Sequence, residues 1–64
     1  PSDFACVYYV DVEPGCSPII FEGDLKVVPE NGMLVLFPAM LHHEVPPTDA
    51  RRMVISMNVD KSYV

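Results

Sequence analysis

The stretch Phe4-Ala-Cys-Val-Tyr-Tyr-Val-Asp-Val12 decides the fold class of this 64-residue chain. β-Branched and aromatic residues dominate it, and such residues favour extended backbone. Glu13-Pro14-Gly15 follows directly, a combination typical of a tight turn. The sequence therefore predicts a strand over residues 4–12 that ends at a turn.

Further short strand patterns follow, each separated from the next by turn residues. They cover residues 18–21, 24–28, 33–37, 41–45 and 51–59, and the first two are either separate strands or one strand broken by a bulge. The third is apolar on both faces, which predicts a central strand. Helical periodicity is absent, and seven prolines disfavour helices. These features predict an all-β sandwich or jelly-roll barrel.

Length and charge narrow the class of protein. A chain this short buries a thin core, and a strong strand begins almost at Pro1, so residues 1–64 are predicted to be one partial domain cut from a longer protein. The net charge of -5 disfavours nucleic acid and anionic membranes as partners. No apolar run approaches the roughly 20 residues of a membrane span. We predict a soluble cytoplasmic protein.

The two cysteines lack the spacing of a zinc or redox motif. Cys6 is interpreted as a small buried apolar side chain within a strand, and Cys16 as a turn residue. A disulfide between them is the minor alternative.

His43 is a candidate binding residue because of the strand face that it occupies. Side-chain alternation places Leu41, His43 and Val45 on one face and puts His42 and Glu44 on the other. The apolar neighbours predict that His43 is buried and points inward, and that the two histidines do not share a metal ion. A core histidine with hydrogen-bonded ring nitrogens is the simpler interpretation, and a metal ligand is the alternative.

The last strand carries an arginine on each face. One face contains Arg52, Val54, Ser56 and Asn58, and the other contains Arg51, Met53, Ile55 and Met57. We expect the methionine face to pack against protein, and the Arg52 face to meet water or a wet cavity. In a cavity the guanidinium would bind a carboxylate through two parallel hydrogen bonds, with Ser56 adding a hydroxyl. A surface arginine is the open alternative.

The order of these features resembles a known enzyme family. Residues 32–38 (Gly-Met-Leu-Val-Leu-Phe-Pro), 43–52 (His-Glu-Val-Pro-Pro-Thr-Asp-Ala-Arg-Arg) and 53–58 (Met-Val-Ile-Ser-Met-Asn) are similar to the C-terminal half of the Fe(II)/2-oxoglutarate dioxygenases, especially the prolyl-4-hydroxylase-like group. Residues 6–10 (Cys-Val-Tyr-Tyr-Val) are similar to the strand that follows the first metal motif of these enzymes. The resemblance implies a double-stranded β-helix, here as an incomplete barrel.

The resemblance also implies roles for individual residues. His43 would be the distal histidine of an iron site built from two histidines and one carboxylate. Arg52 would bind the distal carboxylate of 2-oxoglutarate, and Tyr9 would hydrogen-bond the same cosubstrate. Ser56 occupies a position where such enzymes carry a small hydroxyl or apolar residue. Neither His43 nor Arg52 is expected to transfer a proton. A core tyrosine is the alternative for Tyr9.

The implied cofactors are Fe(II) and 2-oxoglutarate, with oxygen as cosubstrate and ascorbate as a further candidate. The implied reaction is hydroxylation of a C–H bond in an unidentified substrate, either a protein residue or a small molecule. The H-x-D or H-x-E motif that supplies the other two metal ligands is missing from the chain and is expected before Pro1. Residues 1–64 alone are therefore expected to be inactive.

Two alternative functions fit the same residues. One is a cupin-type metal protein that binds a small molecule, and the other is a non-catalytic jelly-roll piece in which His43 lies in the core and Arg52 forms a surface ion pair. In either case an incomplete barrel has open sheet edges, which predict homo-oligomers as a further mode of association.

Overall fold

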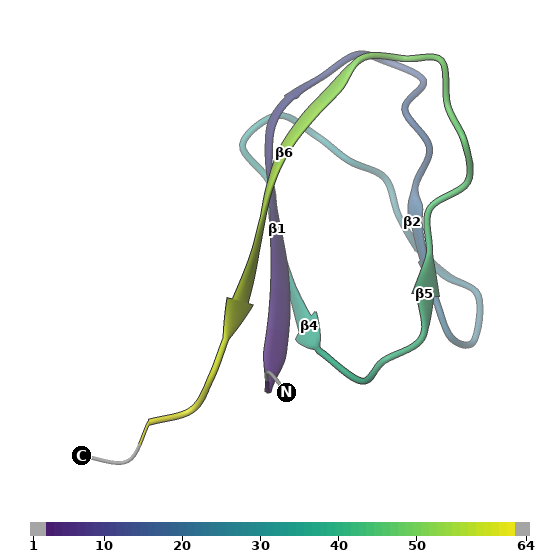
Figure 1. Cartoon of the computed structure of the whole chain (residues 1–64). Coiled ribbons are helices and arrows are strands. Elements are labelled where there is room, and N and C mark those ends of the chain that lie inside the picture. Colours follow the sequence, from purple (N-terminus) through teal and green to yellow (C-terminus); the bar gives the residue numbers. More distant parts are fainter. Residues whose placement is uncertain (1–2, 63–64) are drawn as a thin grey trace.

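A computed structural model of the chain describes residues 3–62, which form two small antiparallel sheets. The first sheet has the order β4-β1-β6, with β4 at Leu34–Pro38, β1 at Phe4–Val12 and β6 at Arg52–Val59. The second has the order β3-β2-β5, with β3 at Leu25–Val27, β2 at Ile19–Phe21 and β5 at His43–Glu44. The two sheets stand opposite one another, and long loops join them (Figure 1). The predicted all-β class is confirmed.

The described residues contain no helix, so none of them forms a helix that could cross a membrane. The predicted strand over residues 4–12 matches β1, and residues 18–28 form two separate strands joined by a tight hairpin. The predicted strand over residues 41–45 shrinks to His43–Glu44. Pro46 and Pro47 lie just beyond Val45 and cannot donate to a ladder, which limits the extension of the strand.

The prediction that residues 33–37 form a central strand is wrong. Among the described strands, β4 lies at the edge of its sheet and pairs with β1 alone. Val35 and Phe37 face the interior, whereas Leu34 and Leu36 are 58% and 60% exposed. The apolar residues on the second face of this segment therefore belong to an uncovered outer face of the sheet. They do not indicate a strand that lies between two neighbouring strands.

Two of the turns depend on glycine at their third residue. The Glu13-Pro14-Gly15 turn closes with a hydrogen bond from the Cys16 amide to the Glu13 carbonyl, and Gly15 has a φ of 91°. The turn before β4 closes between the Met33 amide and the Glu30 carbonyl, with Gly32 at a φ of 82°. A positive φ at this position is what a type II turn requires.

The core lies between the facing sheets. Ile19 and Phe21 of β2 and Phe37 of β4 are buried together, and the two phenyl rings meet edge to face with centroids 5.1 Å apart. Partly buried apolar residues from the first sheet, β3 and the β4–β5 loop pack around them: Ala5, Val7, Val27, Val35 and Leu41. This small cluster holds the inner faces of the two sheets at a fixed separation.

The outer face of the first sheet is apolar and open. The methionine face of β6 was expected to pack against protein, but Met53, Ile55 and Met57 are 58%, 52% and 43% exposed. That expectation is wrong for the described residues, because no described element lies on this side of the sheet. Cys6 is the exception on this face, since it is buried between its strand partners, and both it and Cys16 are free thiols.

Candidate functional site

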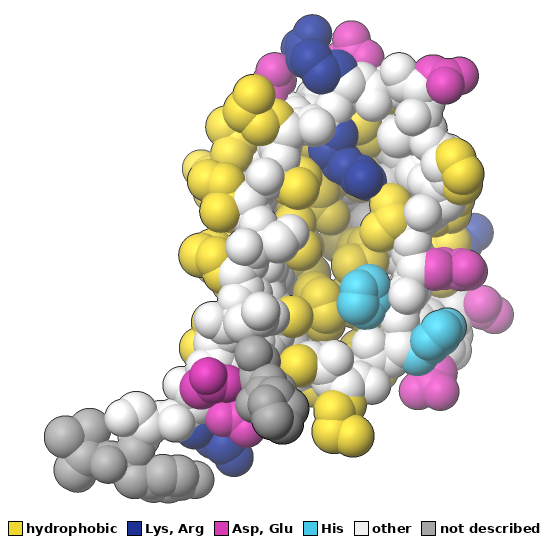
Figure 2. All heavy atoms as spheres, in the orientation of Figure 1, with side chains coloured by type: hydrophobic (Ala, Val, Ile, Leu, Met, Phe, Trp, Pro, Cys, Tyr) yellow, Lys and Arg dark blue, Asp and Glu magenta, His cyan; other side chains and the backbone are white. Residues whose placement is uncertain are grey.

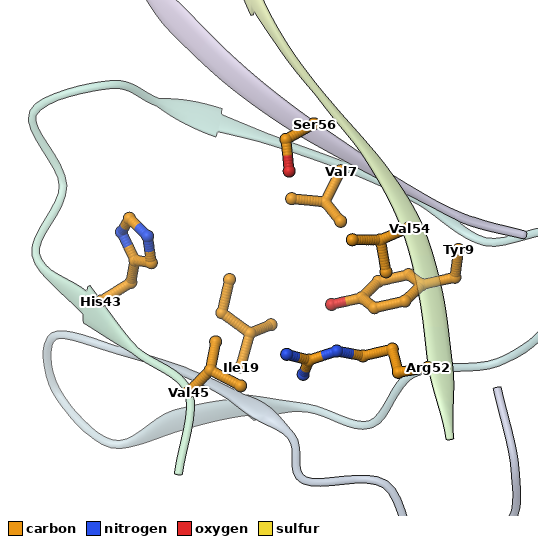
Figure 3. Close-up of a pocket in the computed structure, with 8 residues that line it drawn as sticks. All are labelled: Val7, Tyr9, Ile19, His43, Val45, Arg52, Val54 and Ser56. Atoms are coloured by element: carbon orange, nitrogen blue, oxygen red, sulfur yellow. The ribbon is translucent and has the colours of Figure 1, made fainter. Parts of the chain in front are cut away.

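A cavity of about 180 Å³ opens between the two sheets. It is bordered by basic and histidine side chains in Figure 2 and shown in detail in Figure 3. The lining residues come from four strands and one loop: Val7, Tyr9, Ile19, His43, Val45, Arg52, Val54 and Ser56. All four residues that the sequence singled out, Tyr9, His43, Arg52 and Ser56, are among them. The volume equals that of roughly six water molecules, which suits a small ligand.

Tyr9 forms the polar part of the cavity wall on β1. The residue is 3% exposed, and its hydroxyl points into the cavity beside Arg52 (Figure 3). Burial raises the pKa of Tyr9 above its usual value of 10.0, and the positive charge of Arg52 opposes part of that rise. The hydroxyl is therefore protonated at neutral pH and can donate a hydrogen bond to a bound anion.

Arg52 brings a positive charge that no described carboxylate neutralises. Its guanidinium extends into the cavity (Figure 3), and within residues 3–62 it has no acidic partner within 4.0 Å. Arg51 is different, because its Nη2 lies 3.2 Å from Asp11 Oδ2 and its Nη1 lies 3.8 Å from Glu13 Oε2. Neighbouring arginines thus take different roles, and Arg52 is the one available to a ligand.

His43 lies across the cavity from Arg52 and is held by three contacts. Its Nδ1 lies 3.2 Å from the Leu41 carbonyl oxygen, which can only accept, so this hydrogen bond requires the proton on Nδ1. The imidazole packs edge-on against Phe37 with centroids 4.9 Å apart, and lies 6.1 Å from Phe21. In the neutral ring Nε2 then carries the free lone pair that a metal ligand needs.

The predicted burial of His43 is wrong in degree. Side-chain alternation does place it on the inner face, opposite Phe21 in the ladder, but the residue is exposed, and so is Val45 at 40%. The reason is the shortness of β5, beyond which no described strand covers this edge of the second sheet. His43 therefore lines an open cavity instead of a closed core.

Ser56 and Val54 extend the wall contributed by β6. Ser56 pairs with Val7 and Val54 pairs with Tyr9, so the side chains of these four residues share the inner face of the first sheet. The Ser56 hydroxyl points into the cavity in Figure 3, whereas Ile19 and Val45 form an apolar floor on the opposite side. Sequence reasoning did not identify Ile19 or Val45 as cavity residues, because their placement depends on how the two sheets face each other.

The described residues supply one potential metal ligand at this cavity. No group of three or more His, Cys, Asp or Glu side chains that could hold a metal ion occurs within residues 3–62. His42 is not part of the lining, in agreement with its predicted position on the other strand face. Within the described residues, His43 could therefore serve as one ligand of an iron site and Arg52 could bind the carboxylate of a small acid. These residues do not complete a triad of metal ligands.

Comparison with known proteins yields no relative for this chain: no family model, curated protein or solved structure matches it.

Proposed function

We propose that residues 1–64 form the cosubstrate-binding part of an Fe(II)- and 2-oxoglutarate-dependent oxygenase. One observation carries the proposal: Tyr9, His43, Arg52 and Ser56 come from three strands, and all line one small cavity. The same residues have assigned roles in the family that the sequence resembles. A chance surface histidine and arginine would have no reason to meet at one cavity.

The chemistry of the cavity suits a dicarboxylate. Arg52 offers paired N–H donors that match a carboxylate, and the protonated Tyr9 hydroxyl offers one more. The apolar walls formed by Val7, Val54 and Ile19 would enclose the aliphatic part of the acid and keep water from it. His43 lies on the opposite side, where the 2-oxo end would then be held.

Bound Fe(II) and 2-oxoglutarate would supply the oxidising chemistry, in which decarboxylation to succinate is coupled to C–H hydroxylation. The residues of this chain would bind the metal ion and the acid and orient them. The Leu41 carbonyl fixes the tautomer of His43, the two phenylalanine rings fix the plane of its imidazole, and Arg52 anchors the acid. The two further metal ligands would have to come from outside the described residues.

The arrangement of the strands is compatible with the proposed double-stranded β-helix. Beyond the β2–β3 hairpin, the chain alternates between the two sheets: β4 lies in the first, β5 in the second and β6 in the first again. Such crossing between facing sheets is a property of jelly-roll folds. Within the described residues both sheets have edge strands with one partner each, as an incomplete barrel would have.

Selectivity between two acids tests the anchoring role. We expect 2-oxoglutarate to bind the 64-residue chain at least tenfold more tightly than 2-oxopentanoate, which has the same carbon chain without the distal carboxylate, because one charge-assisted pair contributes about 1.5 to 3 kcal/mol. Isothermal titration calorimetry at low salt measures both. Equal affinities would contradict the proposal and favour a cavity without a dicarboxylate function.

Paramagnetic Mn²⁺ tests the metal-binding role without requiring turnover. In the presence of 2-oxoglutarate, we expect Mn²⁺ to broaden the ring signals of His43 more than those of His42, the matched control one residue away. His43→Ala should abolish the strengthening of 2-oxoglutarate binding by the metal, and His42→Ala should leave it intact. Broadening that is confined to surface carboxylates would assign the metal elsewhere and reject His43 as a ligand.

A further inference from the structure

The pairing of β1 with β6 is interrupted beside the cavity. Tyr9 is opposite Val54, but the next pair is Asp11 with Met53, so Val10 is an extra residue in β1. Such an insertion is a β-bulge, and it reverses which face the following residues occupy.

The bulge decides on which face of the sheet the Asp11 carboxylate lies. Before the bulge the odd-numbered residues, including Val7 and Tyr9, face the cavity. Without the bulge Asp11 would continue this series and lie opposite Arg52 on the inner face. With it, Val12 is opposite Arg52, and Asp11 is opposite Met53 on the outer face.

The contacts of Asp11 agree with this register. Its Oδ2 lies 3.2 Å from both Nε and Nη2 of Arg51, outside the cavity. The amide of Val12, beyond the end of the β1–β4 ladder, donates to Asn31 Oδ1 at 2.6 Å. The bulge is therefore tied down by side-chain contacts on its C-terminal side.

We propose that the bulge at Val10 is a positioning device that assigns the Asp11 carboxylate to Arg51 and so keeps Arg52 available to an anionic ligand. The inference rests on the proposed binding of a dicarboxylate. It explains why Asp11 forms an ion pair with Arg51 and not with the adjacent Arg52. Val10 acts through the register of the sheet and touches no ligand.

An exchange of residues 11 and 12 tests this device. With the bulge in place, Asp11→Val combined with Val12→Asp moves the carboxylate from the outer face, opposite Met53, to the inner face, opposite Arg52, where it competes with the ligand. We expect the affinity for 2-oxoglutarate to fall at least tenfold. Asp11→Val combined with Val12→Asn should keep most of the affinity, and Asp11→Asn alone should leave binding within about twofold of the unaltered chain. An exchange variant that binds as tightly as the unaltered chain, although circular dichroism shows it folded, would overturn the proposal.

A readout without ligand separates this inference from the proposed function. In the unaltered chain, the side-chain carboxyl ¹³C signal of Asp11 should respond to Arg51→Gln and not to Arg52→Gln. In the exchange variant, the signal of the carboxylate introduced at position 12 should respond to Arg52→Gln and not to Arg51→Gln. If 2-oxoglutarate fails to bind but the dependence is exchanged, the proposed function fails and the role of the bulge stands. If the signal depends on Arg51 in both backgrounds, the role of the bulge is rejected.

Discussion

Replacing Arg52 by glutamine is expected to weaken the binding of 2-oxoglutarate about a hundredfold. Among residues 3–62, the guanidinium of Arg52 is the only Lys or Arg group that lines the cavity, and no carboxylate of these residues compensates it. Loss of a charge-assisted carboxylate contact costs about 1.5 to 3 kcal/mol, and about 1.4 kcal/mol corresponds to tenfold. Calorimetric titration at fixed ionic strength measures the change.

Arg51→Gln is the matched control for Arg52→Gln. It removes the same charge one residue away, but its ion pairs with Asp11 and Glu13 are exposed and lie outside the cavity. Such pairs contribute little to stability, so we expect the affinity to change by less than about threefold. Equal losses in the two variants would show that only the overall charge attracts the ligand, and would contradict a specific anchor.

Replacing Phe37 by alanine is expected to lower the free energy of unfolding by about 3 to 4 kcal/mol. The ring is buried, meets Phe21 at 5.1 Å and supports the His43 imidazole at 4.9 Å. A domain of this length has only about 3 to 10 kcal/mol of stability, so the substitution removes between roughly a third and all of it, and the urea midpoint should fall sharply. Urea denaturation followed by circular dichroism measures the loss.

Leu25→Ala is the control for this stability prediction. Leu25 is 62% exposed at the tip of the β2–β3 hairpin, so its truncation should cost less than about 1 kcal/mol. Phe37→Leu keeps most of the apolar volume but removes the edge contact with His43. A loss of less than about 1 kcal/mol for Phe37→Ala would mean that the cluster of Ile19, Phe21 and Phe37 is not the core that joins the sheets.

Local patterns were sufficient to predict most of the strands. Residues 4–12 are dense in β-branched and aromatic residues, and the turn residues Glu13-Pro14-Gly15 follow them. Each of these signals acts over a few residues, which is why β1 was predicted with its correct boundaries. The position of β4 was not predictable in this way. A segment with apolar residues on both faces can be covered on both sides or left open on one, and only the arrangement of the sheets distinguishes these cases.

The candidate site was predictable to a similar extent. Alternation identified Arg52 and Ser56 as sharing a face, and the structure lines one cavity with both of them. Their meeting with His43 depends on a contact between sheets that no short-range pattern encodes. The exposure of His43 and the bulge at Val10 were not predicted, because the first depends on missing strand coverage and the second leaves no distinct residue signature.

The central claim is that the His43 imidazole and the Arg52 guanidinium bind one small acid from opposite sides of the same cavity. The most direct test is a set of intermolecular nuclear Overhauser effects between the methylene protons of 2-oxoglutarate and the ¹³C-labelled methyl groups of the 64-residue chain. We expect effects to Val7 and Val54 inside the cavity, accompanied by a shift of the Arg52 Nε signal. Effects that are confined to methyl groups of the outer face, such as Leu34 or Ile55, would contradict it.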